Sequence, residues 1–434
     1  MSALGIQPTR LTQLDLQVRS PDETTSRVNG HVLASHVDEA AAAWRRRARL
    51  LDGPHVRLRH LARFDERLFA HLAGIRIAGE DGWRAVRSAQ GDGDEGAVAV
   101  LAWVAFADGD AGRMQAALPV MLADATFTRA SVRAMGSLAP ARLVESMRAL
   151  ADSSLPAHRA LALAVQVFQR RDHGTMLRNA LDDADAGLRA EALRATGLLG
   201  RADLVPALID TLRHDSSGSC RQAAAESLLV LGTQEQVSQV VDAWLGDVNA
   251  GRIGRQGLVS CVRASAPEQA RSRIRQWAAS SRHRREALVG AAALGDPAAI
   301  PWMIQQMSDP EVARLALEGF ATITGVDLEL RMFKAAGAGE MQEMPCHPED
   351  EDLPVPDVAG CQAWWRAHAH RFEAGQRYLA GLPMSSRSDC LAVLRDGTQR
   401  QRRAAALELS RLQPGLPLFQ VEALAIRQRR ELGP

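Results

Sequence analysis

Apolar residues recur along most of the chain at the three- and four-residue spacing of amphipathic helices, and these helices come in pairs. Residues 182–212 hold the clearest pair. Its two apolar stripes consist of Leu188, Ala192, Ala195 and Leu199, and of Leu204, Leu208 and Leu212. Gly200 stands between the stripes, where a glycine can end the first helix in a left-handed conformation. One pair cannot bury both stripes alone, so the pattern predicts units that stack on one another.

Residues at equivalent positions of neighbouring units are related by a period of 32 residues. Asp183, Arg189, Ala192 and Gly200 recur as Asp215, Arg221, Ala224 and Gly232. A fixed period of this length with two helices per unit is typical of α-solenoids. We therefore expect an all-α fold, a right-handed superhelix of the HEAT or armadillo type with a helical N-terminal cap and a C-terminal helical subdomain.

Changes in this pattern divide the chain into five parts. Residues 1–35 are polar and mixed, and we interpret them as a flexible arm. Residues 36–93 form the predicted helical cap, and residues 94–334 form the repeat array, with about seven units. Residues 335–362 are acidic and rich in proline, which breaks helices, and predict a long loop. Residues 363–434 return to a helical pattern.

Composition narrows the class of protein. The net charge is +1, and the basic clusters lie near the two ends of the chain, so we expect neither a nucleic acid nor a membrane as partner. The five cysteines are scattered, which argues against a disulfide framework. No apolar run resembles a signal peptide or a membrane span. These features predict a cytoplasmic protein.

The repeated charged residues, Asp183, Arg189, Asp215 and Arg221, allow two interpretations. A catalytic array is one. The structural interpretation is favoured, because a carboxylate at a turn caps a helix and an arginine on the next helix can bond across units. We expect this ladder to hold the solenoid in register. The chain has no nucleophile elbow and no glycine-rich phosphate loop, so we predict no catalytic residue and no cofactor.

A metal site is a further alternative, because one part of the chain is rich in ligand types that suit zinc. The candidates are Cys346, His347, Cys361, His368 and His370. Their spacing does not favour chelation, since there is no Cys-x-x-Cys and His368 and His370 point to different faces of a helix. We predict no metal, and leave open a cryptic ligand or metal site near Cys346 and His347.

The most distinctive stretch outside the repeats is CQAWWRAHAHRFEAGQRYLAGLP, residues 361–383. We favour the interpretation that it packs as core or as a cap on the last repeat. The alternative is an exposed anchor for a partner, made of Trp364, Arg377 and Tyr378, because these residue types dominate interface hot spots.

Several stretches, in order along the chain, resemble an uncharacterised proteobacterial family of HEAT-like repeat proteins of the phycobilisome-lyase type. They are HLAGIRIAGEDGW (71–83), LRAEALRATGLLGRADLVP (188–206), AAALGDPAAIPWMI (291–304), FATITGVDL (320–328), WWRAHAHRFEAGQRYLAGLP (364–383) and TQRQRRAAALELSRLQPGLPLF (398–419). Members of that family are often encoded beside type VI secretion genes. The resemblance implies an accessory protein that holds or loads a secretion effector or spike component. It implies no catalytic residues, and lyase activity does not follow from a shared repeat.

Three hypotheses follow. The first is a non-enzymatic scaffold or adaptor that binds a protein along the concave face. The second is a HEAT-repeat enzyme, lyase-like or acting on nucleic acid, which would need a pocket between repeats with a perturbed acid or base. The third is a binder of a small regulatory ligand at the C-terminal end of the array.

Overall fold

The computed structural model describes residues 28–90, 93–232, 234–247, 254–328, 333 and 346–433. Within these residues the fold is an α-solenoid, as the repeat pattern predicts, and a two-stranded antiparallel hairpin is its only sheet. None of the described helices combines the length and the apolar content that crossing a membrane requires.

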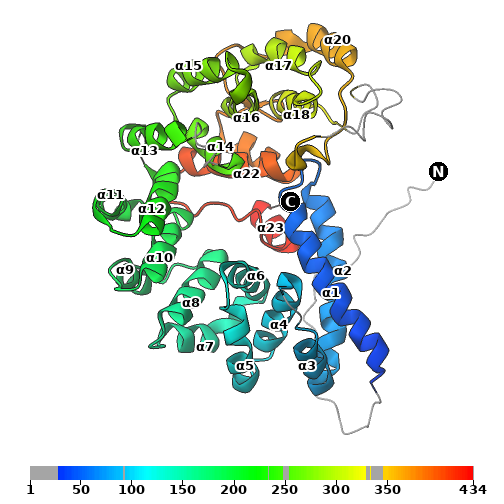
Figure 1. The fold of residues 1–434 in the computed structure, drawn as a ribbon, viewed down its shortest axis with the longest axis vertical. Helices are drawn as coiled ribbons and strands as arrows, with labels where there is room; N and C mark the ends of the chain where they lie inside the picture. The colour runs from blue at the N-terminus through cyan, green and yellow to red at the C-terminus, as the bar shows by residue number, and fades with distance from the viewer. Residues whose placement is uncertain are drawn as a thin grey trace, which may run out of the picture.

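The array consists of an inner and an outer row of helices (Figure 1). The inner row is α4 (Glu95–Ala107), α6 (Ala125–Gly136), α8 (Pro156–Phe168), α10 (Ala186–Leu198), α12 (Gly218–Leu231), α14 (Arg255–Ala264), α16 (Arg284–Leu294) and α18 (Ala313–Thr324). The outer row is α5 (Ala111–Met121), α7 (Pro140–Ala151), α9 (Gly174–Leu181), α11 (Val205–His214), α13 (Gln234–Asp247), α15 (Pro267–Ala278) and α17 (Ile300–Gln306). Each inner helix packs on the next inner helix as well as on its outer partner, so the core runs along the inner row.

The N-terminal cap is a helical hairpin with a short third helix. These helices are α1 (Gly30–Leu50), α2 (Leu58–Ile77) and α3 (Gly79–Ser88). Helix α1 begins earlier than the predicted boundary at residue 36, because Asn29 accepts hydrogen bonds from the backbone N–H groups of His31 and Val32 and caps the helix. The rest of the predicted arm lies outside the described residues.

The C-terminal part contains α20 (Val358–His368), β1 (Tyr378–Leu379), β2 (Leu382–Pro383), α21 (Arg387–Asp396), α22 (Gln399–Leu412) and α23 (Ala425–Leu432). Helix α20 starts inside the segment predicted to be a loop, because Asp357 caps it by accepting from the Gly360 N–H. Part of the predicted acidic loop lies outside the described residues. Short 3₁₀ turns occur at Ala202–Leu204, Ser281–His283, Pro297–Ala299, Pro348–Asp350 and Ala369–Arg371.

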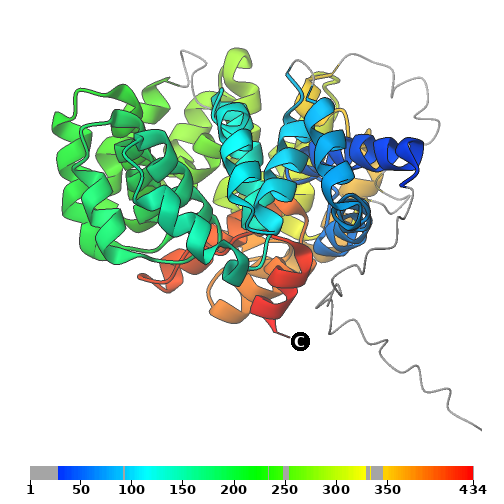
Figure 2. The ribbon, with the colours of Figure 1, turned by 90° about the horizontal axis from the view of Figure 1, so that it is seen from below.

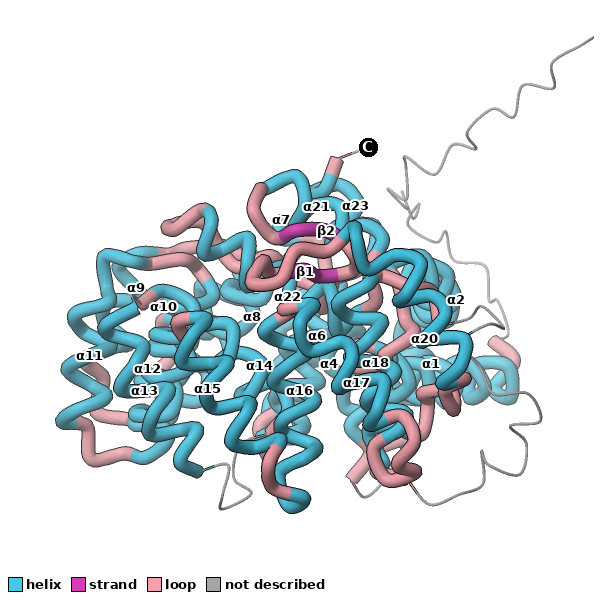
Figure 3. Tube along the Cα trace, turned by 90° about the horizontal axis from the view of Figure 1, so that it is seen from above, coloured by secondary structure: helices cyan, strands magenta, loops and turns pink. Residues whose placement is uncertain are grey.

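Residues 377–433, which we call the strap, are not a separate appendage. Figures 2 and 3 show them lying across one end of the standing helices of the array. At this end the last turns of the inner helices leave backbone carbonyls without intrahelical partners. The strap supplies donors to these carbonyls on every inner helix from α8 to α18.

The donors are backbone N–H groups and long polar side chains. They are Gln420 on Phe168 O, Leu418 N on Leu198 O, Arg411 on Leu229 O, Arg377 on Arg263 O and Leu294 O, Tyr378 N on Gly295 O, and Ala380 N on Thr322 O. The contact is close at the glycines that end the inner helices. A Cβ added at Gly200 would lie 2.3 Å from the Leu416 carbonyl oxygen, and one added at Gly295 would lie 2.4 Å from the Tyr378 carbonyl oxygen. Both glycines also have positive φ, which other residues rarely adopt.

The strap also closes the solenoid into a ring. Leu51, Val56, Leu58 and Leu61 share one hydrophobic core with strap residues such as Leu394. The backbone joins as well, since the Gln399 N–H donates to the Val56 carbonyl at 2.7 Å. Residues 51–62 and the strap are therefore one packing unit, and Figure 1 shows these segments side by side.

Candidate functional site

The repeated charged residues lie at the end of the array opposite the strap. Arg159 contacts Asp183 at 2.8 Å, and Arg189 contacts Asp215 at 3.2 Å, in each case across one repeat. Each aspartate also accepts a backbone N–H in its own turn. The hydrogen bond from the Asp185 N–H, followed by that of Arg159, lowers the pKa of Asp183, and Arg189 lowers the pKa of Asp215. Arg221 donates to the carbonyls of Asp215 and Ser216. These contacts link one repeat to the next.

Of the three residues considered as a partner anchor, Tyr378 is buried, and Trp364 and Arg377 are half-buried. Tyr378 is 8% exposed, and Trp364 packs edge-on against Phe320 and stacks on His368. Arg377 forms an ion pair of 2.6 Å with Glu408 on α22. The three side chains are occupied in joining the array to the strap and α20, which is the core-packing interpretation.

The residues considered for a metal site do not converge. No group of three or more His, Cys, Asp or Glu side chains in the described part of the chain can hold a metal ion. His347 accepts from the Glu349 N–H, and the His368 ring bonds to the Trp364 carbonyl. Burial, with Asp357 nearby, raises the pKa of the Cys361 thiol to about 12, so it stays protonated at neutral pH.

Part of the inner surface remains open between α10 and α12. Arg194 on α10 lies 3.6 Å from Glu226 on α12, and both side chains are about 40% exposed. Gln222, one turn earlier on α12, is exposed and donates to Glu226 at 3.0 Å. The inner surface nearer α14 and α18 is covered instead, because Arg255 on α14 pairs with Glu318 on α18, and Arg400 of the strap binds the same carboxylate.

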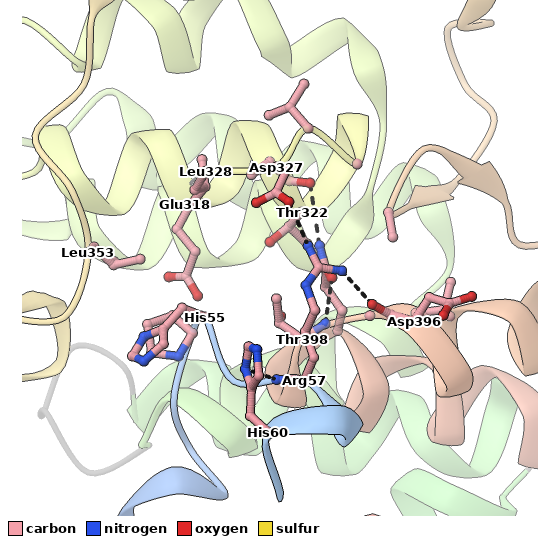
Figure 4. A pocket seen from close by; sticks show the side chains of 18 of the residues that line it. His55, Arg57, His60, Glu318, Thr322, Asp327, Leu328, Leu353, Asp396 and Thr398 are labelled. Atoms are coloured by element: carbon pink, nitrogen blue, oxygen red, sulfur yellow. Dashed lines mark hydrogen bonds and ion pairs between the residues drawn. The ribbon is translucent and has the colours of Figure 1, made fainter. Parts of the chain in front are cut away.

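A cleft of about 590 Å³ lies where segment 54–60 meets the strap and the end of α18, and we call it the closure cleft. Its walls come from segment 54–60 at the start of α2, from the end of α18 with residues 325–328, from residues 352–354, and from the strap. Figure 4 shows His55, His60 and Arg57 on the side of α2, Glu318 and Asp327 on the side of α18, and Asp396 on the strap. Segments far apart in sequence thus build one site.

Arg57 links the walls of the closure cleft. Its guanidinium donates to the Asp396 carbonyl, at the end of α21, and lies 3.7 Å from the Asp327 carboxylate. Its backbone N–H donates to Nδ1 of His60, which places the proton of a neutral His60 ring on Nε2. Burial and then the charge of Arg59 lower the pKa of His60, so this ring is neutral at pH 7.

Glu318 is the most enclosed charge at the cleft, with a side chain 6% exposed. Burial would raise its pKa, but Arg255 and Arg400 outweigh burial, and the pKa of Glu318 is lowered. It is therefore an ionised, paired carboxylate and not a proton donor. Among the described residues that line the cleft there is no serine, cysteine, lysine or tyrosine, and its hydroxyl groups are those of Thr322 and of Thr398, the residue before α22.

The closure cleft is not among the sites predicted from the sequence. The basic residues His55, Arg57, Arg59 and His60 stand out in the sequence as a cluster, which is the one signal available. Their partners lie hundreds of positions later, and no periodicity connects them. The hypothesis of a small-ligand site at the C-terminal end of the array stays a prediction, and the end of α18 forms part of the wall of this cleft.

Comparison with known proteins supports the repeat assignment. Residues 175–254 match the family model of HEAT repeats, and this segment contains α10, α11, α12 and α13. No curated protein matches the chain significantly. The match covers the units in which the 32-residue period is clearest. HEAT repeats commonly mediate protein binding.

Proposed function

We propose that this protein is a non-enzymatic scaffold that binds a partner protein on the open inner surface between α10 and α12. The observation that carries the proposal is the exposed polar group of Gln222, Glu226 and Arg194 on two consecutive inner helices of the HEAT segment. Stacked helices hold such groups at fixed spacing, and solenoids use their concave surfaces for extended contacts.

The strap narrows this surface to one part of the array. The strap covers the C-terminal ends of the inner helices, for example through Arg411 on the Leu229 carbonyl. Its Arg400 binds the Glu318 carboxylate on the inner side of α18. A partner would therefore enter from the end that carries the Arg–Asp contacts. Within this proposal, the finer role is that of an adaptor for a type VI secretion effector or spike component, which the family resemblance supports.

The test is a pair of variants with equal changes in charge. Gln222→Arg/Glu226→Arg alters the inner surface, and Asp210→Arg/His214→Arg alters exposed residues of outer helix α11 with the same four-residue spacing. Tagged full-length protein is recovered from its native host, and co-purifying proteins are identified by mass spectrometry. We expect a partner that the wild type and the α11 variant retain and the inner variant loses, with melting temperatures within a few degrees of one another. Equal recovery by both variants contradicts the proposal.

A further inference from the structure

Two histidines face each other across the helical hairpin of the N-terminal cap. His36 on α1 and His71 on α2 are both half-buried, and their Nδ1 atoms lie 3.1 Å apart. The rings meet edge to face, with an angle of 63° between their planes. When both rings are neutral, one Nδ1–H donates to the other Nδ1, so the contact is a direct hydrogen bond. The pair belongs neither to the closure cleft nor to the inner surface between α10 and α12.

The packing of the hairpin fixes where the two rings lie. Val37 follows His36, Leu72 follows His71, and both apolar residues are buried members of one hydrophobic cluster. A Cβ added at Gly74 would lie 3.1 Å from Cδ2 and Nε2 of His36, closer than an ordinary van der Waals contact, so the absence of a side chain there makes room for the ring. Side chains that are already held in place lose little conformational freedom when they bind a ligand together.

The distance between the two nitrogen atoms suits a single metal ion. Zinc binds imidazole nitrogens at about 2.0–2.1 Å in tetrahedral geometry, which places two such nitrogens about 3.3 Å apart. The observed 3.1 Å is close to this separation, so small rotations of the rings can bring both Nδ1 atoms onto one ion. Imidazole suits zinc, copper and nickel, whereas calcium and magnesium take oxygen ligands. The ligand type therefore selects a class of metal.

The geometry points to a binding site for a divalent transition-metal ion such as Zn²⁺, formed by Nδ1 of His36 and Nδ1 of His71. On binding, the proton of the hydrogen bond moves to Nε2 of the ring that carried it, so both rings stay neutral and both Nδ1 atoms offer a lone pair to the ion. No third His, Cys, Asp or Glu from the described part of the chain joins the pair, and water completes the coordination. The ion ties α1 to α2 within the cap, and the site does not depend on the proposed partner surface.

Isothermal titration calorimetry of the reduced, chelator-treated full-length protein tests the site with Zn²⁺, Ni²⁺ and Mg²⁺. We expect Zn²⁺ and Ni²⁺ to bind and Mg²⁺ not to bind. His36→Gln and His71→Gln should each weaken Zn²⁺ binding by more than about tenfold, because even the loss of a group that only supports a metal ligand costs about ten- to a hundred-fold. His31→Gln changes an exposed histidine of the same helix and should bind like the wild type. Equal binding by all four proteins would mean adventitious binding only, and that result or no binding by the wild type overturns the inference.

Hydrogen–deuterium exchange shows whether the bound ion ties the two helices together. Zn²⁺ should slow exchange in both α1 and α2 of the wild type, since a ligand that binds only the folded hairpin stabilises it. In His36→Gln and in His71→Gln, exchange should be the same with and without Zn²⁺. Circular dichroism and the melting temperature without metal report the folding of each variant. Slower exchange in other segments alone, or a melting temperature that Zn²⁺ raises equally in the wild type and both variants, contradicts the assigned geometry.

Discussion

Glu318 shows how single residues join distant parts of this chain. Its carboxylate accepts from Arg255 on α14 at 2.7 Å and from Arg400 on the strap at 2.8 Å. With its side chain 6% exposed, the charge is removed from water, and the two guanidinium groups compensate for the lost hydration. Neither arginine belongs to the periodic pattern of the repeats, so the sequence gives no sign of this pairing.

Glu318→Gln should destabilise the protein in a pH-dependent way. At pH 7 we expect the free energy of unfolding to fall by about 3–5 kcal/mol, because two guanidinium groups, each on a side chain only 18% exposed, lose their counter-charge. The pKa of Glu318 is lowered in the folded state, so its stabilising effect is complete above the unfolded pKa near 4.5 and is lost as the pH falls through the folded pKa. Denaturant titrations from pH 7 to pH 3 should therefore show the wild type approaching the variant. Exposed Glu311→Gln is the control, and a gap that does not change with pH would refute this account.

At the scale of elements, the inner helices have two ends with different chemistry. Their N-terminal ends carry the Asp and Arg residues that repeat every 32 positions, so sequence reasoning found these residues. Their C-terminal ends are bound by the strap, whose donors come from residues with no common spacing. Gly200 was predicted to end α10, and its φ of 72° agrees. The absence of a side chain at Gly200 also lets the Leu416 carbonyl approach, and Leu416 lies more than 200 positions later in the sequence.

Helix α23 offers a matched test of this capping. Arg427 donates to the Gln169 carbonyl at the end of α8, whereas Arg429 on the same helix is exposed. We expect Arg427→Ala to lower the free energy of unfolding by about 1.5–3 kcal/mol, the usual range for a hydrogen bond to a charged group, and Arg429→Ala to change it by less than about 0.5 kcal/mol. Chemical denaturation of the two variants measures the difference. Equal effects would mean that the strap contributes nothing through this contact.

At the scale of the whole molecule, the solenoid could be predicted from the sequence and the ring closure could not. The array depends on the apolar stripes of its helices and on contacts between neighbouring units, and both of these features repeat along the chain. The closure depends on a core whose members lie within residues 51–62 and 379–432. Each of those stretches resembles an ordinary amphipathic helix by itself, so nothing in either one indicates the other. The closure cleft exists only because these stretches meet, which is why its residues escaped prediction.

The shared core predicts that the two ends of the chain lose structure together. Leu394→Ala removes a fully buried side chain on α21 and should lower the free energy of unfolding by about 2–5 kcal/mol. Because Leu394 packs in one cluster with Leu51, Leu58 and Leu61, hydrogen–deuterium exchange should rise in residues 51–62 as well as in 379–432. Leu208→Ala, at an equally buried position of the array core, should leave exchange at both ends unchanged. If Leu394→Ala increased exchange in the strap alone, the strap would be an independent unit and the ring would be held by its polar contacts.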